Sequence, residues 1–147
     1  MSNFYNKNGA AFMMNKDDWE TPQSLFDELD KKYHFTLDPC SNGVNAKCGK
    51  FYTKEENGLL MTWANEVVFC NPPYGRDLHK WVEKCHEESK HAKIVLLIPA
   101  RTDTRYFHEY IYGKAEIEFL KGRLKFEKFG KPMNSAPFPS MIVKWGL

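Results

Sequence analysis

Four consecutive residues near the middle of the chain, Asn71-Pro72-Pro73-Tyr74, carry the groups needed to bind a planar amine. They follow the apolar run 67–70. Proline lacks an N–H for a strand ladder and favours an extended residue before it, so a strand should end here with free carbonyls. The side-chain oxygen of Asn71 and the carbonyl of Pro72 can accept the two N–H groups of a conjugated amine, which draws electron density toward its nitrogen. Tyr74 adds a ring face for stacking. Together they predict a clamp for a planar NH₂ group.

The surrounding sequence predicts strands that alternate with helices, and these elements would position the clamp. Short apolar or β-branched runs indicate strands, and apolar residues three or four apart indicate helices. Thr21 and Pro22 suit the cap and first position of the first helix, Thr102 or Thr104 can cap the third, and Gly113 can end it. The expected strands are 34–38, 50–53, 66–70, 92–100, 115–130 and 140–146, and the expected helices begin near 21, 76 and 102.

This order predicts a single α/β domain at residues 18–147, preceded by a flexible arm at residues 1–17. The sheet should be open and mostly parallel, with a terminal antiparallel strand pair and the run 92–100 at its centre. Open parallel sheets bind ligands beyond the carboxyl ends of their strands, where both Asp38 and Asn71 fall. Asp38 then has two interpretations: it binds a ligand, or it caps the turn that Pro39 begins.

Composition excludes several classes of protein. With 147 residues, 42% hydrophobic and 27% charged, the chain has the balance of a globular domain. No apolar run approaches the ~20 residues of a membrane span, and the polar start does not resemble a signal peptide, so we expect a cytoplasmic protein. The four cysteines form no C-x-x-C pair and are expected to be reduced thiols. His79, Cys85 and His86 match no zinc spacing, so no metal is predicted.

The motifs around the clamp resemble those of the phage-type DNA adenine methyltransferases, over about residues 18 to 145. They occur in the same order: "DWETPQSLFDEL", "FTLDPCS", "FYTKEENGL" before a Trp, "FCNPPYG", "LLIPARTDTRYFH" and "GRLKF". The resemblance implies a Rossmann-like methyltransferase fold, S-adenosylmethionine as cofactor, and methylation of the exocyclic amine of an adenine flipped out of double-stranded DNA. The sulfonium is already an activated electrophile, so catalysis would be positioning and polarisation.

The resemblance also implies roles for individual residues. Asn71, Pro72, Pro73 and Tyr74 would be catalytic and hold the flipped base. The family often has glycine in the turn after the first strand, whereas the next glycine here is Gly43, a departure that affects the backbone contacts to the cofactor. Either Glu55 or Glu56 would hold the ribose hydroxyls. The implied cofactor-binding residues are Trp19, Thr21, Pro22, Asp38, Pro39, Cys40, Glu55, Glu56 and Asn71.

Positive charge concentrates toward the C-terminal end. Between Arg101 and Lys131 there are eight Lys/Arg and five Asp/Glu, an excess of 8 − 5 = +3. Residues 101–103 could bind DNA phosphate or form a helix cap with a surface salt bridge. The alternation of Leu124 and Phe126 with basic residues indicates either a half-buried strand or a basic stripe against a DNA backbone. The candidate DNA-binding residues are Arg101, Arg105, Arg123, Lys125 and Lys128.

Other acceptors and roles fit the same pattern. Similar Asn-Pro-Pro-Tyr sites methylate protein glutamine amides or RNA bases, and a DNA-binding module that has lost catalysis is a third interpretation. The chain has little length for a separate target-recognition domain. Base contacts should therefore come from residues 41–50 or 127–137, or from a second subunit, and we expect either modest sequence specificity or a very short recognised site. The sequence does not determine the oligomeric state.

Overall fold

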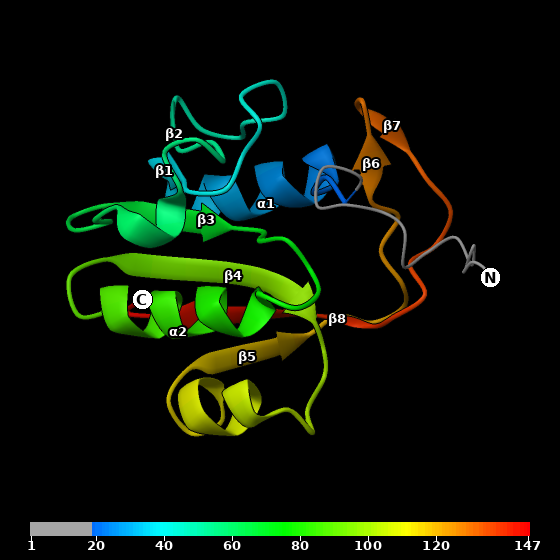
Figure 1. Cartoon of the computed structure of the whole chain (residues 1–147). Coiled ribbons are helices and arrows are strands. Elements are labelled where there is room, and N and C mark those ends of the chain that lie inside the picture. Colours follow the sequence, from blue (N-terminus) through cyan, green and yellow to red (C-terminus); the bar gives the residue numbers. More distant parts are fainter. Residues whose placement is uncertain (1–18) are drawn as a thin grey trace.

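A computed structural model describes residues 19–147, so the predicted arm at residues 1–17 lies outside the described part. One mixed sheet organises this part, with the strand order β2-β1-β3-β4-β8-β5 (Figure 1). The strands β1 (Leu37–Asp38), β2 (Lys50–Phe51), β3 (Val67–Cys70) and β4 (Lys93–Pro99) are parallel. The strand β8 (Ser140–Trp145) is antiparallel to both β4 and β5 (Glu116–Phe119). The predicted mixed α/β fold, mostly parallel with an antiparallel pair at its end, is confirmed.

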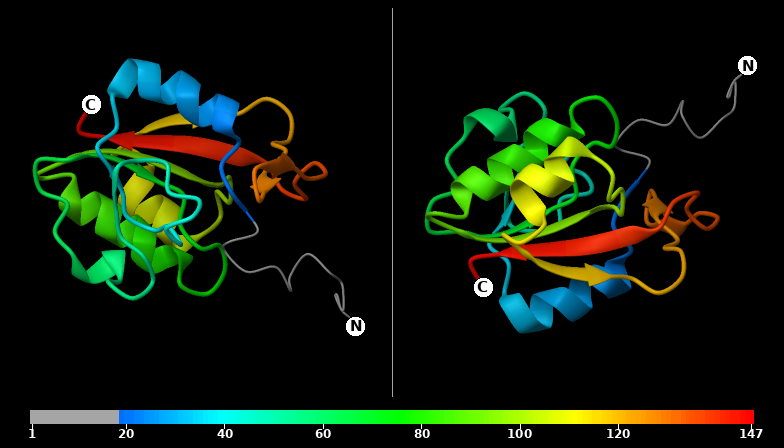
Figure 2. Two further views of the ribbon diagram at one scale, coloured as in Figure 1. Left: turned by 90° about the horizontal axis from the view of Figure 1, so that it is seen from above. Right: turned by 90° about the horizontal axis from the view of Figure 1, so that it is seen from below.

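Helices cover both faces of the sheet (Figure 2). Helix α1 (Gln23–Tyr33) lies on one face, and α2 (Leu78–Glu88) lies on the other with the π-helical turn η4 (Phe107–Ile111). Between β2 and β3 the chain forms the 3₁₀ turn η3 (Gly58–Leu60). The short strands β6 (Glu127–Lys128) and β7 (Lys131–Pro132) form a separate hairpin beside the sheet (Figure 1). None of the helices in residues 19–147 has the length and apolar character to span a membrane.

Alternation along the central strands builds two hydrophobic cores. In β4, Ile94, Leu96 and Ile98 pack with α2, while Val95 and Leu97 pack with Phe26 and Leu29 of α1. Successive strand side chains point to opposite faces, so a strand covered on both sides must be apolar at nearly every position. Six of the seven residues of β4 are buried accordingly, and its predicted place near the centre of the sheet is confirmed.

Two local predictions are wrong. Helix α1 begins at Gln23 with Pro22 as its N-cap, so Thr21 lies one residue too early to cap it, and its hydroxyl accepts from Nδ2 of Asn71. The expected strand 115–130 ends at Phe119. Leu124 and Phe126 are still more buried than the basic residues between them, but their carbonyls accept N–H bonds from Ala136 and Met133 instead of from a sheet neighbour.

The ends of the third helical segment match the prediction. The hydroxyl of Thr104 accepts the N–H of Phe107 at 3.3 Å, so Thr104 is the cap of the two candidates. Gly113 has φ +79°, a left-handed conformation that stops a helix and suits glycine.

The loop after β2 packs tightly on the turn after β1 at Gly58. A Cβ added there would lie 2.1 Å from the carbonyl oxygen of Pro39, which is backbone and cannot move aside. We expect Gly58→Ala to lower the free energy of unfolding by about 1–3 kcal/mol through overpacking. Gly49→Ala is the matched control, because a Cβ there meets nothing within 4 Å. Urea unfolding followed by circular dichroism measures both, and equal stability of the two variants would contradict this packing.

Candidate active site

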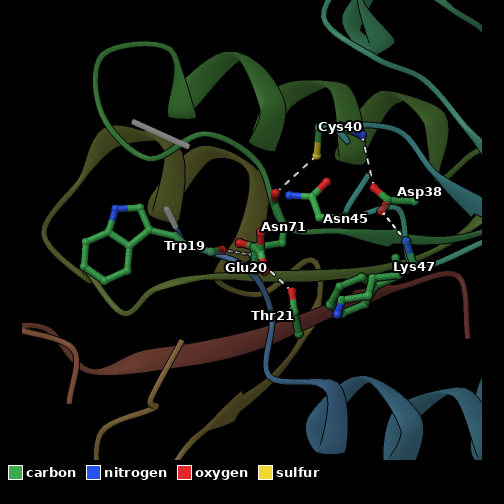
Figure 3. Close-up of a pocket in the computed structure, with 9 residues that line it drawn as sticks. Trp19, Glu20, Thr21, Asp38, Cys40, Asn45, Lys47 and Asn71 are labelled. Carbon is green, nitrogen blue, oxygen red and sulfur yellow. Dashed lines mark hydrogen bonds between the residues drawn. The ribbon is translucent and has the colours of Figure 1, made fainter. Parts of the chain in front are cut away.

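The residues singled out at the ends of β1 and β3 lie together. Because β1 and β3 are adjacent and parallel, Asp38 and Asn71 reach the same edge of the sheet. Both line a small cavity of about 30 Å³ (Figure 3). Its lining comes from the segment before α1, the ends of β1 and β3, and the loop after β1: Trp19, Glu20, Thr21, Asp38, Cys40, Asn45, Lys47, Phe69 and Asn71.

The side-chain amide of Asn71 is fixed by three hydrogen bonds. Its Nδ2 donates to the carbonyl of Trp19 at 2.8 Å and to Oγ1 of Thr21 at 3.0 Å. Its Oδ1 accepts from the hydroxyl of Tyr74 at 2.7 Å. A backbone carbonyl can only accept, so the contact with Trp19 settles which end of the amide is nitrogen. The amide oxygen has a second lone pair that these bonds do not use. Because the segment before α1 holds Nδ2, it also fixes the direction in which the oxygen points.

The carbonyl of Pro72 is the second predicted acceptor, and that role stays a prediction. Within residues 19–147 it takes part in no backbone hydrogen bond, because β3 ends at Cys70 and two prolines follow. The carbonyl of Asn71, in contrast, accepts the thiol of Cys40 at 3.3 Å. A carbonyl without a backbone partner in the described residues is compatible with the acceptor edge expected from the two prolines.

Tyr74 belongs to a cluster of four aromatic rings. Its ring centre lies 6.4 Å from that of Trp19, 6.1 Å from Phe126 and 5.7 Å from Phe138. The latter two contacts are edge-to-face, which is favourable for aromatic pairs. Burial raises the pKa of Tyr74 well above its usual value, so the hydroxyl stays protonated. Its one hydrogen has the shorter contact with Oδ1 of Asn71, at 2.7 Å, and the carbonyl of Leu97 lies at 3.2 Å. Phe126 and Phe138 were not singled out from the sequence.

Trp19 lies differently from the other predicted cofactor residues. Its backbone borders the small cavity, while its ring turns away from Asp38 toward the aromatic cluster (Figure 3). The sequence motif around Trp19 therefore serves the site twice: its carbonyl holds Asn71, and its ring packs against Tyr74.

Asp38 is a nearly buried carboxylate that organises the loop after β1. Its Oδ1 accepts the N–H of Cys40 at 3.3 Å and its Oδ2 accepts the N–H of Lys47 at 3.0 Å. The bond to Cys40 is the local turn contact of the plainer interpretation, whereas the bond to Lys47 closes a longer loop. Burial raises the pKa of Asp38 above its ordinary value, and the two backbone bonds oppose that shift only in part.

A larger cavity of about 560 Å³ adjoins the turn after β1. Cys40 lines both cavities, so they meet at this residue. Neither Glu55 nor Glu56 lines either cavity, and Glu56 instead caps the turn by accepting from N–H and Oγ1 of Thr53. The polar side chains that line the large cavity include Asn57 and Asp77. The remaining lining is Pro39, Thr53, Lys54, Gly58, Leu59, Pro73 and Trp81.

Sequence reasoning missed several polar residues of these cavities. Glu20 and Lys47 line the small cavity, and Asn57 and Asp77 line the large one. Their positions were the available signal. Glu20 and Asn57 lie within quoted motifs, and Lys47 and Asp77 lie in the segments that follow β1 and β3. Asn57 carries an additional structural mark, since its φ of 59° is left-handed.

The five predicted basic residues fall into separate groups. Arg101 and Arg105 follow β4 on the side of α2, where Arg105 lines a cavity with His79 and Glu83. Arg123 and Lys125 lie beside α1, and Arg123 donates to the carbonyl of Ala136 at 3.2 Å. All five are exposed, Lys128 being in β6. Contact of these residues with DNA stays a prediction.

Cys40, Cys48, Cys70 and Cys85 form no disulfide, in agreement with the expected thiols. Burial raises the pKa of Cys70 far above its usual value, and burial followed by nearby carboxylates raises that of Cys48 to about 12. These two thiols are protonated at neutral pH and are poor nucleophiles. Within residues 19–147, no three His, Cys, Asp or Glu side chains are grouped so as to hold a metal ion.

The fold and the site thus define an α/β protein in which the ends of parallel strands carry an oriented asparagine amide between a carboxylate-lined cavity and an aromatic cluster. Residues 10–146 match the family described as DNA N-6-adenine-methyltransferase (Dam). The chain belongs to this family.

Two relatives are similar in sequence. The DNA N-6-adenine-methyltransferase of Escherichia phage T1 is 35% identical over 113 residues, which cover 74% of this chain and 47% of the relative. YfdM of Escherichia coli strain K12 is 37% identical over 65 residues, which cover 40% of this chain and 71% of that protein. The aligned part of the chain thus spans about half the length of the phage T1 relative.

The raised pKa of Asp38 predicts a pH-dependent stability. Between the ordinary carboxyl pKa of ~3.9 and the raised value, the folded state keeps a proton that the unfolded state has lost. The free energy of unfolding should fall with rising pH there, by up to about 1.4 kcal/mol per pH unit. Asp38→Asn cannot titrate and lacks this component, so the wild type should lose stability relative to the variant as pH rises. Urea unfolding from pH 3 to 8 measures the difference, and parallel curves would contradict the raised pKa.

Proposed function

We propose that the chain transfers a methyl group from S-adenosylmethionine to the exocyclic amine of adenine in double-stranded DNA. The observation that carries the proposal is the fixed amide of Asn71 at the end of β3, followed in the chain by the carbonyl of Pro72, which makes no backbone hydrogen bond within residues 19–147. The family and the printed name of the phage T1 relative support adenine in DNA as the acceptor. The strand order supports a Rossmann-like arrangement with the site at the carboxyl edge of the parallel strands.

In this proposal Asn71 and Pro72 activate the acceptor. The lone pair of an aromatic amine is delocalised into its ring and is a weak nucleophile. The second lone pair of Asn71 Oδ1 and the carbonyl of Pro72 accept the two N–H groups, so that charge developing on the nitrogen meets fixed dipoles. Tyr74 stays protonated and helps to hold the amide oxygen in place. Once the methyl group is transferred, the cationic nitrogen is strongly acidic and loses its proton to solvent water.

The aromatic cluster is the proposed surface for the flipped adenine. Stacking on Tyr74 requires a neighbouring ring to shift, because Trp19 and Phe138 both pack against it. Base–aromatic stacking contributes roughly 1–3 kcal/mol, which is comparable to the favourable energy of the ring contacts it would replace. We therefore assign Trp19 to the base side of the site through its ring, and to Asn71 through its carbonyl.

The two cavities together suit the cofactor. When bound, S-adenosylmethionine supplies a methyl group activated on a sulfonium. In the small cavity, Asp38 and Glu20 offer negative charge for the sulfonium and ammonium groups, and Lys47 offers positive charge for the carboxylate. The large cavity has the volume of a small-molecule site and contains hydrogen-bonding and aromatic side chains for a nucleoside. We propose Asn57 and Asp77 for the ribose hydroxyls in place of Glu55 or Glu56.

The DNA backbone would meet the exposed basic residues on both sides of the site. Arg101 and Arg105 lie on one side, and Lys125 and Lys128 on the other, so the duplex would cross the carboxyl edge of the sheet. Arg123 is tied to the carbonyl of Ala136 and helps to shape the loop that carries Phe138. A cytoplasmic location, in the host cell if a phage encodes the chain, agrees with this substrate.

Replacing Asn71 by alanine tests the central step. We expect Asn71→Ala to reduce methyl transfer by about 10²- to 10³-fold, because it removes a preorganised acceptor at the reacting nitrogen. The measurement is transfer of radiolabelled methyl from S-adenosylmethionine to unmethylated duplex DNA, with separation of the product nucleosides. Circular dichroism and cofactor binding of the variant serve as controls for folding. If the wild type binds the cofactor but places no label in methyladenine, the proposal is contradicted. Label in RNA or in protein glutamine would instead assign a different acceptor.

Thr21 should act as a positioning residue through Asn71. Thr21→Val removes the hydroxyl that accepts from Nδ2 of Asn71 at 3.0 Å, in a side chain that is 2% exposed. We expect a roughly 5- to 50-fold lower kcat with little change in KM for the cofactor, the loss of about one buried hydrogen bond. Thr21→Ser keeps the hydroxyl and should restore most of the activity. Equal kcat for the Val and Ser variants would exclude this role.

A further inference from the structure

Two loops at the site present apolar side chains to solvent. Val44 is 90% exposed and Phe129 is 82% exposed, the highest values among the large apolar side chains of residues 19–147. Both line one cleft of about 550 Å³, between the loop after β1 and the β6–β7 hairpin. This cleft adjoins the small cavity of Asn71, because Glu20, Asn45 and Lys47 line both. Exposed apolar groups beside a polar site mark an interaction surface.

The loop that carries Val44 is held by its own side chains. Oδ1 of Asn42 accepts the N–H groups of Val44 and Asn45, both at 2.9 Å. In return, Oδ1 of Asn45 accepts the N–H of Asn42 and the hydroxyl of Ser41, both at 3.1 Å. The exposed valine therefore lies on a turn with a defined shape.

Phe129 occupies the two-residue turn of the β6–β7 hairpin. Its φ is +53° and that of Gly130 is +77°, a pair of left-handed residues typical of a tight hairpin turn. Asn, Asp or Gly suits the first of these positions, whereas a bulky aromatic residue there is strained. Glu20 ties the turn to the catalytic segment, since its Oε1 accepts the N–H of Gly130 at 3.3 Å and its backbone pairs with Glu127. The ring is thus presented to solvent beside the site, with Nζ of Lys128 5.9 Å from its centre.

Charge around the hairpin favours an anionic partner. Lys125, Lys128 and Lys131 are exposed on or beside it. Lys47 lines the cleft itself, so these four lysines outnumber the two carboxylates that line it, Glu20 and Glu127. An apolar tip among lysines fits stacked bases between phosphate backbones better than it fits the surface of a second copy of the chain.

We propose that Phe129 is a wedge that enters the base stack of duplex DNA at the position vacated by the flipped adenine, with the Val44 loop as the opposite wall of the cleft. The inference rests on the proposed function. Flipping a base leaves an apolar gap in the stack, and an inserted apolar side chain compensates the lost stacking. The connection through Glu20 holds Phe129 and the Asn71 amide at a fixed relative position. Insertion of Phe129 into the base stack would therefore place the flipped adenine at Asn71.

The test compares Phe129→Ala with wild type on two duplexes. Sites methylated in a plasmid are first mapped by sequencing, and a synthetic duplex of that sequence is made fully paired or with an abasic site opposite the target adenine. We expect Phe129→Ala to lower kcat/KM on the paired duplex by about 10- to 100-fold, the value of one base–aromatic stack. On the abasic duplex, where flipping is easy, the variant should approach wild type. Phe119→Ala is the matched control, because Phe119 is 59% exposed on β5, outside the cleft.

A binding measurement separates this inference from the proposed function. Wild type should bind a duplex with one abasic gap more tightly than the same paired duplex, and Phe129→Ala should lose that preference, whether or not methyl transfer occurs. Absence of methylated DNA with wild type would overturn the proposed function. Equal activity of wild type and Phe129→Ala on the paired duplex, or equal loss on both duplexes, would overturn the wedge. A change from dimer to monomer on gel filtration of Phe129→Ala would assign the ring to a second copy instead.

Discussion

The site depends on the hydrogen bonds that tie the amide of Asn71 to the segment before α1. Asn71 ends a strand in the middle of the sheet, while Trp19 and Thr21 lie about fifty positions earlier, and their oxygens occupy the two N–H groups of its side chain. An asparagine amide has a donor end and an acceptor end of nearly equal shape. By engaging both donors, the N-terminal segment fixes the acceptor end toward the site. An amide fixed in this way can act as a preorganised dipole, and a freely rotating one cannot.

The rest of the fold supplies the rigidity that this arrangement needs. The strand β3 lies between β1 and β4 and is covered on both faces, so the position of Asn71 is set by packing rather than by its loop. The prolines that follow remove N–H donors from the strand end and leave a carbonyl available. The same segment before α1 pairs with Glu127, so the hairpin, the amide and the sheet form one continuous structure.

Asp38 and Glu56 have different roles because they differ in burial. Asp38 is buried and holds a loop in shape through backbone N–H groups, whereas Glu56 is exposed and caps a turn. Both are used locally, yet only Asp38 also faces a cavity. A residue can thus satisfy the plain structural role and remain at the ligand surface, and the two interpretations of Asp38 are compatible.

The sequence by itself determined the alternation of strands and helices as far as β4, the mixed α/β sheet, the central place of β4 and the meeting of Asp38 and Asn71 at one edge. These properties follow from local chemistry: apolar runs make buried strands, prolines end them, and parallel strands bring their carboxyl ends together. Only the tertiary structure decided that Thr21 serves Asn71 instead of capping a helix, that Trp19 turns toward Tyr74, and that Phe126 and Phe138 complete the cluster. It also decided that the segment 120–126 leaves the sheet and that Asn57 and Asp77, not Glu55 or Glu56, line the large cavity. Each of these depends on contacts between residues far apart in the chain or on the path of a loop. Periodicity and the spacing of residue types predict neither such contacts nor such paths.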